Sequence, residues 1–247
     1  GLAGTGKTTL LHTARMCWEL EGYEVRGATL AGKASEGLLH GAGIESSTIH
    51  RLLIDIERGK TRLYENTVLV IDEAGMVGTR LMNRLVEATE KAGAQLILVG
   101  DAKQLQAIEA GGAFLEIHKR LEGAELTEIV RQREGWARNA VRDFAAGYAR
   151  EGLYAFAQRG LVHVADERME AYEQLIDQWK VGGVHHPEDQ LIFTGTRKDA
   201  AILNHLAQSE RQAAGVLSQE SLFVGHEQYW VGDRILFTKN SSNYGVK

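Results

Sequence analysis

The sequence predicts an α/β protein with a parallel sheet, and two observations lead to this prediction. Short strand-like runs alternate with segments of helix length along the chain of 247 residues, which is typical of repeated strand–helix–strand units. Two of the runs, residues 68–71 and 96–99, are apolar without alternation, as expected of central parallel strands that helices cover on both faces. With 44% hydrophobic and 25% charged residues, the composition is that of an ordinary globular protein.

The first half of the chain contains the clearest elements. Its predicted strands cover residues 24–30, 67–71, 95–99 and 125–130. The clearest helix covers Thr79 to Ala92, where apolar side chains share one face and Gly93 provides a stop. We expect this helix to pack on the sheet.

The second half continues the alternation of strands and helices. The arginine-rich residues 131–150 carry apolar positions at helical spacing and are expected to form an amphipathic helix with solvated arginines. A short apolar run at 161–164 precedes a second helix over residues 169–179, which two glycines close. These elements are expected to begin another α/β lobe.

The single proline of the chain, Pro187, lies in the glycine-containing segment 181–190, which is predicted to be a connector. The connector leads into a predicted strand at residues 191–194. Thr196 and Asp199 then form a capping box, which predicts the start of a further helix.

Charge and cysteine content restrict the class of protein. The net charge of −5 does not favour nucleic-acid binding by the surface as a whole, so any such contact must be made by a local groove. The single cysteine, Cys17, excludes an internal disulfide framework and favours a reducing compartment, so the cytoplasm is the expected location. No apolar run reaches the roughly 18 residues of a membrane-spanning helix. The one close histidine pair, His185 and His186, is interpreted as part of a solvated loop.

The chain opens on a phosphate-binding motif, Gly-Leu-Ala-Gly-Thr-Gly-Lys-Thr at residues 1–8, followed directly by an apolar-periodic helix. Glycines allow backbone N–H groups to converge on phosphate oxygens at the positive helix end. Lys7 can reach the β and γ phosphates of ATP, and the Thr8 hydroxyl can bind Mg²⁺. The residues expected to bind the nucleotide are Gly1, Gly4, Thr5, Gly6, Lys7, Thr8 and Thr9.

Two adjacent carboxylates follow the buried run at residues 68–71. Ligands of open α/β sheets bind at the carboxyl ends of the strands, so Asp72 and Glu73 are expected to face the same crevice as the P-loop. Asp72 is predicted to bind Mg²⁺ together with Thr8, and Glu73 to orient or deprotonate the attacking water. The alternative, a solvated acidic strand end, would be preferred only without Lys7.

A third motif follows the run at residues 96–99 and reads Gly100-Asp101-Ala102-Lys103-Gln104-Leu105. Together with the P-loop and the Asp-Glu-Ala sequence at residues 72–74, it resembles motif III of superfamily 1 helicases of the RecD-like branch. The resemblance implies RecA-like lobes. It also implies that Gln104 senses the γ-phosphate and links hydrolysis to the DNA groove.

Further segments resemble other motifs of this helicase family, in the order in which the family has them. Residues 28–35 resemble motif Ia of this family and residues 47–52 resemble its Thr-Ile-His element, both of which line the single-strand path. Hydroxyl, lysine and loop-backbone donors there suit phosphate contacts without base reading. The residues expected on this path are Thr29, Lys33, Thr48 and His50.

Residues 126–133 resemble motif IV of the family. In that motif an arginine approaches the γ-phosphate from the second lobe. The resemblance implies this role for Arg131, with Arg133 as the alternate.

Longer runs resemble the helicase portion of TraA-type conjugative relaxases, and this similarity extends over nearly the whole chain. The runs that carry it include residues 26–30, 70–80, 104–111 and 131–133. The resemblance implies a two-lobed motor that uses ATP and Mg²⁺ to move 5′ to 3′ on single-stranded DNA while plasmid DNA is unwound for conjugation. Single-stranded DNA and the relaxosome and conjugation proteins are the expected partners.

The same resemblance implies a division into lobes. A first RecA-like lobe is expected over residues 1–130, with its first strand before Gly1, and a partial second lobe over residues 131–247, ending before motifs V and VI. This fragment alone is expected to have weak activity or none. Two alternatives stay open: a RecD-like repair or recombination helicase, and a non-motor protein that binds nucleotide or single-stranded DNA without stepping.

Overall fold

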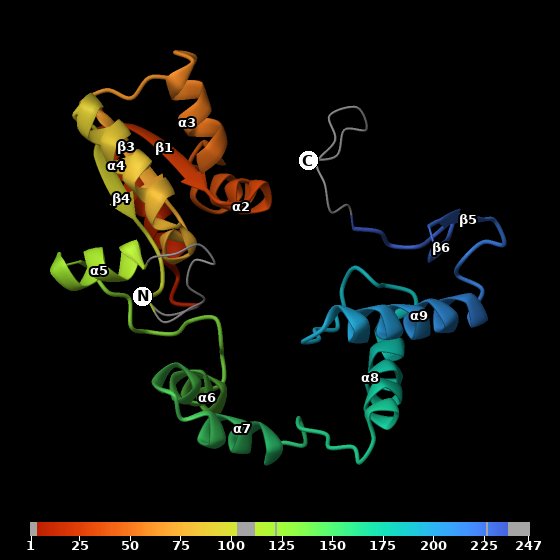
Figure 1. Cartoon of the computed structure of the whole chain (residues 1–247). Helices are drawn as coiled ribbons and strands as arrows, with labels where there is room; N and C mark the ends of the chain where they lie inside the picture. The colour runs from red at the N-terminus through yellow and green to blue at the C-terminus, as the bar shows by residue number, and fades with distance from the viewer. Residues whose placement is uncertain (1–3, 103–111, 122, 226, 237–247) are drawn as a thin grey trace. The chain divides into compact units, whose positions relative to one another are not determined.

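The computed structural model describes residues 4–102, 112–121, 123–225 and 227–236 (Figure 1). The chain divides into two compact units, Gly1–Arg159 and Gly160–Lys247. This division falls later in the chain than the lobe boundary expected after residue 130. Each unit is described by itself.

The first unit is built on a parallel sheet, as the sequence predicts. Its strands are β1 (Glu24–Thr29), β2 (Ser46–Thr48), β3 (Thr67–Ile71) and β4 (Gln95–Leu98), in the order β2-β1-β3-β4. All three pairings are parallel. The α/β class with a parallel sheet is therefore confirmed.

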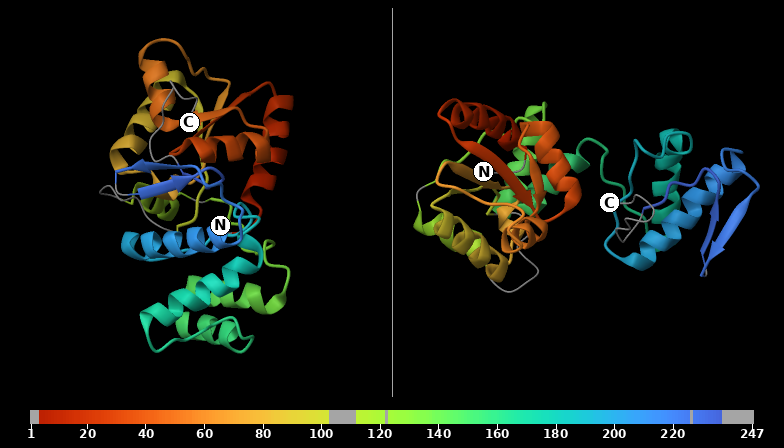
Figure 2. Two further views of the ribbon diagram at one scale, coloured as in Figure 1. Left: turned by 90° about the vertical axis from the view of Figure 1, so that its right-hand side faces the viewer. Right: turned by 90° about the horizontal axis from the view of Figure 1, so that it is seen from above.

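Helices cover both faces of this sheet because the central strand β3 is apolar on both sides. Val68, Leu69, Val70 and Ile71 are each 0% exposed. Val68 and Val70 pack with side chains of α1 (Lys7–Leu20) and α2 (Gly32–Ala42). Leu69 and Ile71 pack with α3 (Ile49–Glu57) and α4 (Thr79–Ala92) on the other face. Figure 2 shows the sheet between these two layers of helices.

The direction of the strands determines where the sequence motifs lie. α1 ends at Leu20 and a short turn leads into the start of β1 at Glu24, so the C-terminal end of α1 lies at the amino edge of the sheet. The helix runs back across the sheet, and its N-terminal end lies at the carboxyl edge. That edge also receives the segments that follow the other strands, because every strand runs the same way.

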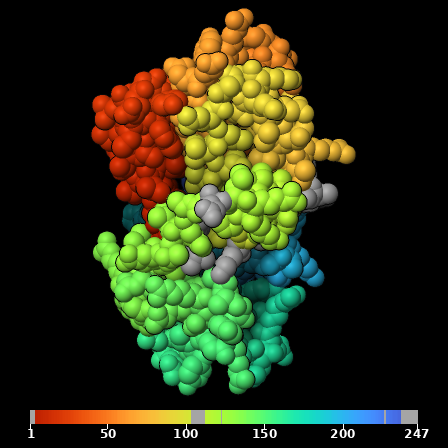
Figure 3. Space-filling model, turned by 90° about the vertical axis from the view of Figure 1, so that its left-hand side faces the viewer, coloured from red at the N-terminus to blue at the C-terminus, as the bar shows by residue number. Residues whose placement is uncertain are grey.

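Close packing of backbone joins the segments that follow β3 and β4. A Cβ atom at Gly100 would lie 3.1 Å from the backbone nitrogen of Gly75, which belongs to the short 3-10 helix η1 (Ala74–Met76). Phe114 of α5 (Ala113–Arg120) packs beside both glycines. In the space-filling view of Figure 3, the light-green residues of α5 lie against the yellow region that follows β3.

Two sequence expectations in this unit are wrong. Residues 125–130 form no strand, because Val130 and Arg131 direct their N–H groups to the carbonyl of Gly4 instead of to a neighbouring strand. The single helix expected over residues 131–150 is two helices, α6 (Gly135–Ala146) and α7 (Ala149–Ala157). Gly147 separates them, since its φ of 89° is left-handed.

The helical pair α6 and α7 packs through aromatic side chains. The rings of Trp136 and Phe156 meet edge to face with centroids 5.2 Å apart, and Phe144 lies 6.2 Å from Phe156. The guanidinium of Arg159 lies 4.1 Å from the centre of the Trp136 ring. Gly152 lies directly against this cluster, since a Cβ atom there would lie 2.8 Å from the Phe144 ring.

The second unit contains α8 (Arg168–Gly183), α9 (Arg197–Ala213) and a hairpin of β5 (Ser221–Val224) and β6 (Glu227–Trp230). The helix cap expected at Thr196 is confirmed, since its hydroxyl accepts the N–H of Asp199 at 3.1 Å. The strand expected at residues 191–194 is wrong, since the structure assigns neither this segment nor residues 161–164 to a strand or a helix.

A buried arginine connects the elements of the second unit. Arg211 of α9 is 9% exposed and donates to the carbonyls of Val184 and Gly232. Its neighbour Asp233 accepts hydrogen bonds from Gln208 and from the backbone N–H of Trp230. The guanidinium thereby joins the end of α8, the helix α9 and the end of the hairpin.

Among the helices that the structure describes, none combines the length and the apolar character needed to cross a membrane.

Gly27 of β1 provides a test of the packing between the sheet and α2. A Cβ atom there would overlap Ser46 Oγ and lie 2.8 Å from Leu38 Cδ2, so we expect Gly27→Ala to lower the free energy of unfolding by about 1–3 kcal/mol. Gly37, inside α2, has no atom within 4 Å of a built Cβ, and Gly37→Ala should raise stability by roughly 0.5–1 kcal/mol. Chemical denaturation measures the free energy of unfolding of each variant. Equal effects of the two substitutions would contradict the packing described.

Tyr172 of α8 provides a test in the second unit. Its hydroxyl donates to Asp199 Oδ1 at 2.7 Å and is the largest cause that lowers the pKa of Asp199 below 3.8. A lowered carboxyl pKa contributes stability above the ordinary pKa, and this contribution is lost as the pH falls through the folded value. Tyr172→Phe should lower the thermal midpoint by a few degrees at neutral pH and by less in acid, as the Asp199 carboxylate becomes protonated.

The matched control is Tyr154→Phe, since Tyr154 is 63% exposed. It should leave the midpoint unchanged at both pH values. If Tyr172→Phe lowers the thermal midpoint equally at both pH values, the carboxylate takes no part in the contact.

Candidate nucleotide-binding site

The P-loop lies at the N-terminal end of α1. Gly4 and Gly6 have φ angles of 74° and 79°, which only glycine adopts at little cost, and Gly6 is the N-terminal cap of the helix. The helix begins at Lys7, as the motif predicts. Unpaired N–H groups at a helix N-terminus suit the oxygens of a phosphate. Gly1 lies outside the described residues.

Thr8, the predicted ligand of Mg²⁺, is packed against α2. Its methyl carbon lies 2.5 Å from the position of a Cβ atom at Gly41, so any larger residue at position 41 would displace Thr8. The Thr8 side chain itself is exposed, as a ligand of a bound ion must be. The close approach of Gly41 to Thr8 could not be predicted from the sequence, because a glycine inside a helix carries no signal of a contact.

The two carboxylates directly follow β3. Asp72 Oδ1 accepts the backbone N–H of Glu73 at 2.8 Å, and the N–H of Ala74 donates to the carbonyl of Val99 at 2.8 Å. Glu73 has a φ of 54° and is the one non-glycine residue with a positive φ in the described part of the chain. Such a conformation costs free energy and is often found at functional sites. The side chain of Glu73 is exposed, and that of Asp72 is partly exposed.

A hydroxyl and a carboxylate form the donor set that the sequence predicts for Mg²⁺. Oxygen ligands of this kind are those that Mg²⁺ prefers, and the ion commonly uses only one or two protein ligands besides phosphate and water. Thr8 and Asp72 both belong to segments at the carboxyl edge of the sheet. The residues present therefore fit the ion.

The predicted motif III is described only in part. Gly100 packs between Phe114 and Gly75, and Asp101 is 8% exposed. Gln104, the predicted sensor of the γ-phosphate, lies outside the described residues.

The predicted motif IV is bonded to the P-loop. The N–H groups of Val130 and Arg131 both donate to the carbonyl of Gly4, at 2.9 and 3.0 Å. A Cβ atom at Gly4 would lie 2.7 Å from the Cβ atom of Arg131, so the contact requires glycine at position 4. Arg131 was expected to approach from a second lobe, whereas this segment belongs to the same compact unit as the P-loop. Arg133, the alternate, is also exposed and in this unit.

The four residues predicted on the DNA path differ in exposure. Lys33 at the start of α2 and His50 in α3 are exposed, and Thr48 caps α3 by accepting the N–H of Arg51. Thr29 is 0% exposed, and its hydroxyl donates to the carbonyl of Ala31. Thr29 therefore shapes the turn that leads into α2 and presents no surface of its own in this conformation.

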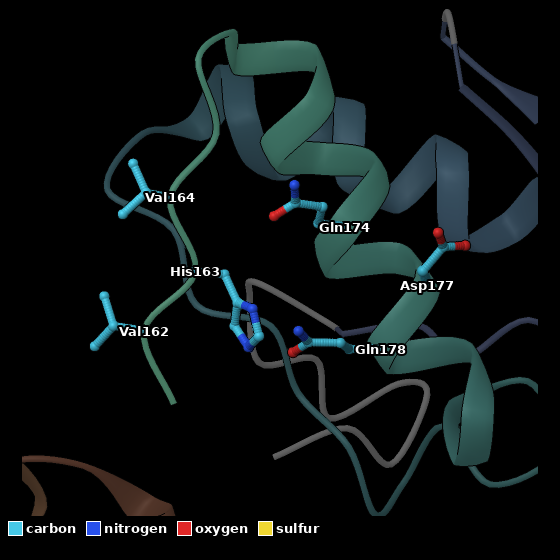
Figure 4. A pocket seen from close by; sticks show the side chains of 6 residues that line it. All are labelled: Val162, His163, Val164, Gln174, Asp177 and Gln178. Carbon is cyan, nitrogen blue, oxygen red and sulfur yellow. The ribbon is translucent and has the colours of Figure 1, made fainter. Parts of the chain in front are cut away.

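The second unit contains a surface depression and an exposed cluster of polar side chains. A depression of about 460 Å³ lies between residues 162–164 and α8, and Figure 4 shows His163 directed toward Gln178, with two valine side chains on the other side of the backbone. His186 and Glu188 lie close together, 3.3 Å between Nδ1 and Oε1, and both are exposed. The loop containing His185 and His186 is thus solvent-exposed, as predicted.

Comparison with known proteins identifies relatives along the whole chain. The chain is 42% identical over 256 residues to the conjugal transfer protein TraA of Rhizobium radiobacter, which covers all of this chain and 23% of that protein. It is 28% identical to the ATP-dependent RecD2 DNA helicase of Deinococcus radiodurans, over 98% of this chain and 34% of that protein.

A third relative is the multifunctional conjugation protein TraI of Escherichia coli, with 26% identity over 91% of this chain and 15% of that protein. The chain thus spans about a quarter of the length of its TraA relatives. These matches confirm the expected resemblance to TraA-type proteins and to RecD-like helicases.

A family model described as an AAA domain matches residues 1–167, which include the P-loop, the strand β3 with its two carboxylates and the Arg131 segment. On this match the chain belongs to the AAA domain family.

Proposed function

We propose that this chain is part of a motor that uses ATP to move along single-stranded DNA, and that it acts as a helicase in conjugative plasmid transfer. The observation that carries the proposal is the direct bonding of the Arg131 segment to Gly4 of the P-loop. A P-loop at a helix N-terminus serves many nucleotide-binding proteins, but an arginine held beside it supplies a charge that can respond to the γ-phosphate.

The nucleotide is held at the N-terminal end of α1. Backbone N–H groups from Gly4 to Thr9 surround the phosphates, and Lys7 neutralises their charge. Thr8 and Asp72 would hold Mg²⁺, which would supply positive charge to offset the negative charge on the phosphate oxygens.

Glu73 acts on the attacking water. Its backbone is left-handed, and its side chain is exposed at the carboxyl edge of the sheet. A carboxylate in this position can orient the water and accept its proton. Gln104 and Arg131 respond to the presence of the γ-phosphate.

DNA binds along the same edge through its backbone. Lys33 follows β1, Thr48 is the last residue of β2, and His50 follows β2. The strand β1 lies between β2 and β3, and the three strands are parallel, so these residues lie at the same carboxyl edge of the sheet. Thr29 contributes by holding the turn before Lys33. Because these groups suit phosphates, we expect binding without sequence preference.

Stepping requires two lobes that close on ATP and open after hydrolysis, with 5′ to 3′ movement. The second lobe begins within residues 131–247 of this chain. In conjugation, the partners are the relaxosome and other transfer proteins.

A repair helicase is the second candidate, because the RecD2 relative matches 98% of this chain. The higher identity to TraA, 42% against 28%, favours conjugation. A non-motor role is the third candidate, and it predicts ATP turnover that single-stranded DNA does not stimulate.

Catalysis by Glu73 is tested in a full-length version of the protein. We expect Glu73→Gln to lower DNA-stimulated ATP turnover by about 10²–10⁴-fold while nucleotide binding is retained, since only the proton acceptor is lost. Lys7→Ala should abolish turnover and weaken nucleotide binding. Glu90→Gln on the exposed face of α4 is the matched control and should change neither. DNA-stimulated turnover that survives both Lys7→Ala and Glu73→Gln would refute the proposed motor.

The DNA path is tested through the salt dependence of binding. Each phosphate contact by a lysine contributes about −0.7 to the slope of log K against log salt concentration for single strands. Lys33→Ala should therefore reduce the slope by about this amount, measured with labelled oligonucleotides of several sequences. Lys91→Ala, at the end of α4, should leave the slope unchanged. An unchanged slope for Lys33→Ala would remove this residue from the path.

A further inference from the structure

The side chain of Gln132 carries a buried polar atom without a hydrogen-bond partner. Its Oε1 is the one buried side-chain nitrogen or oxygen in the described residues for which this is true. Buried polar groups are nearly always paired, so an unpaired one in a native structure requires an explanation. None of the functions assigned above involves Gln132.

The location of Gln132 suggests that explanation. Oε1 lies 3.5 Å from the position of a Cβ atom at Gly4, so the amide lies against the P-loop turn. The backbone on both sides is fixed: Arg131 donates to the Gly4 carbonyl, and the Gln132 carbonyl accepts from Arg138 Nη1 at 3.0 Å. The main chain is thus held in place beside the P-loop, while Oε1 of the side-chain amide has no hydrogen-bond partner.

An amide can pair with a phosphate. The group has both a donor and an acceptor end, and a half-turn about its last bond exchanges them at little cost. Its NH₂ can donate to a phosphate oxygen, which is the group that a P-loop receives. We propose that Gln132 is a nucleotide-positioning residue whose side-chain amide donates a hydrogen bond to the terminal phosphate of ATP bound at the P-loop.

This inference rests on the proposed function and makes it more specific. Arg131 and Gln132 are consecutive, so one segment supplies a charge and an amide to the same phosphate. The contact exists only with a triphosphate, since ADP lacks the terminal group. Gln132 therefore contributes to the discrimination between ATP and ADP.

The test compares the affinities of ADP and a non-hydrolysable ATP analogue, both with Mg²⁺, for the full-length protein. Gln132→Leu keeps the size of the side chain and removes its hydrogen bonds. It should weaken binding of the ATP analogue by about tenfold and leave ADP binding within about twofold. Gln132→Glu introduces a side chain of the same shape with a negative charge. It should weaken binding of the ATP analogue further, because the carboxylate repels the phosphate.

Gln158→Leu is the matched control, since Gln158 is exposed at the end of α7. It should change neither affinity. Equal losses for ADP and the analogue in both Gln132 variants would overturn the inference in favour of a structural role, as would the absence of any loss. Lys7→Ala separates the two proposals: if it leaves both nucleotides bound at wild-type affinity, the P-loop assignment itself fails.

Discussion

Burial of β3 on both faces is the constraint on which the first unit depends. Its alternate side chains enter two separate apolar clusters, one formed with α1 and α2 and the other with α3 and α4. A strand covered in this way pairs in parallel with neighbours that helical crossovers deliver. Because all the strands then point the same way, residues far apart in the sequence meet at one edge. The P-loop, the Asp72–Glu73 pair and the segments with Lys33 and Thr48 all follow from this arrangement.

The contact between the P-loop and the segment after residue 129 adds a second constraint. One carbonyl, that of Gly4, accepts two backbone N–H groups, and the packing there leaves no room for a side chain on Gly4. The phosphate-binding loop and the arginine proposed to respond to the phosphate are thereby parts of one compact unit. Backbone hydrogen bonds from Val130 and Arg131 connect the loop to this segment directly.

The sequence predicted what depends on local pattern and on chemical type. The uninterrupted apolar runs at β3 and β4 predicted parallel strands, and the cap at Thr196 predicted the start of α9. Residues 125–130 were predicted wrongly as a strand, because a propensity pattern cannot show that the backbone groups are used by a distant glycine. The left-handed Glu73 and the fit of Gly41 against Thr8 could not be predicted either, since both follow from tertiary packing.

The central claim is that the P-loop and the segment of residues 130–132 form one nucleotide site. Amide hydrogen exchange of the protein, with and without an ATP analogue and Mg²⁺, tests it most directly. The account predicts that the analogue slows exchange at residues 4–9 and at Val130 and Arg131 together, and leaves residues 59–64, in the loop between α3 and β3, unchanged. Slower exchange in the P-loop with no change at Val130 and Arg131 would contradict it.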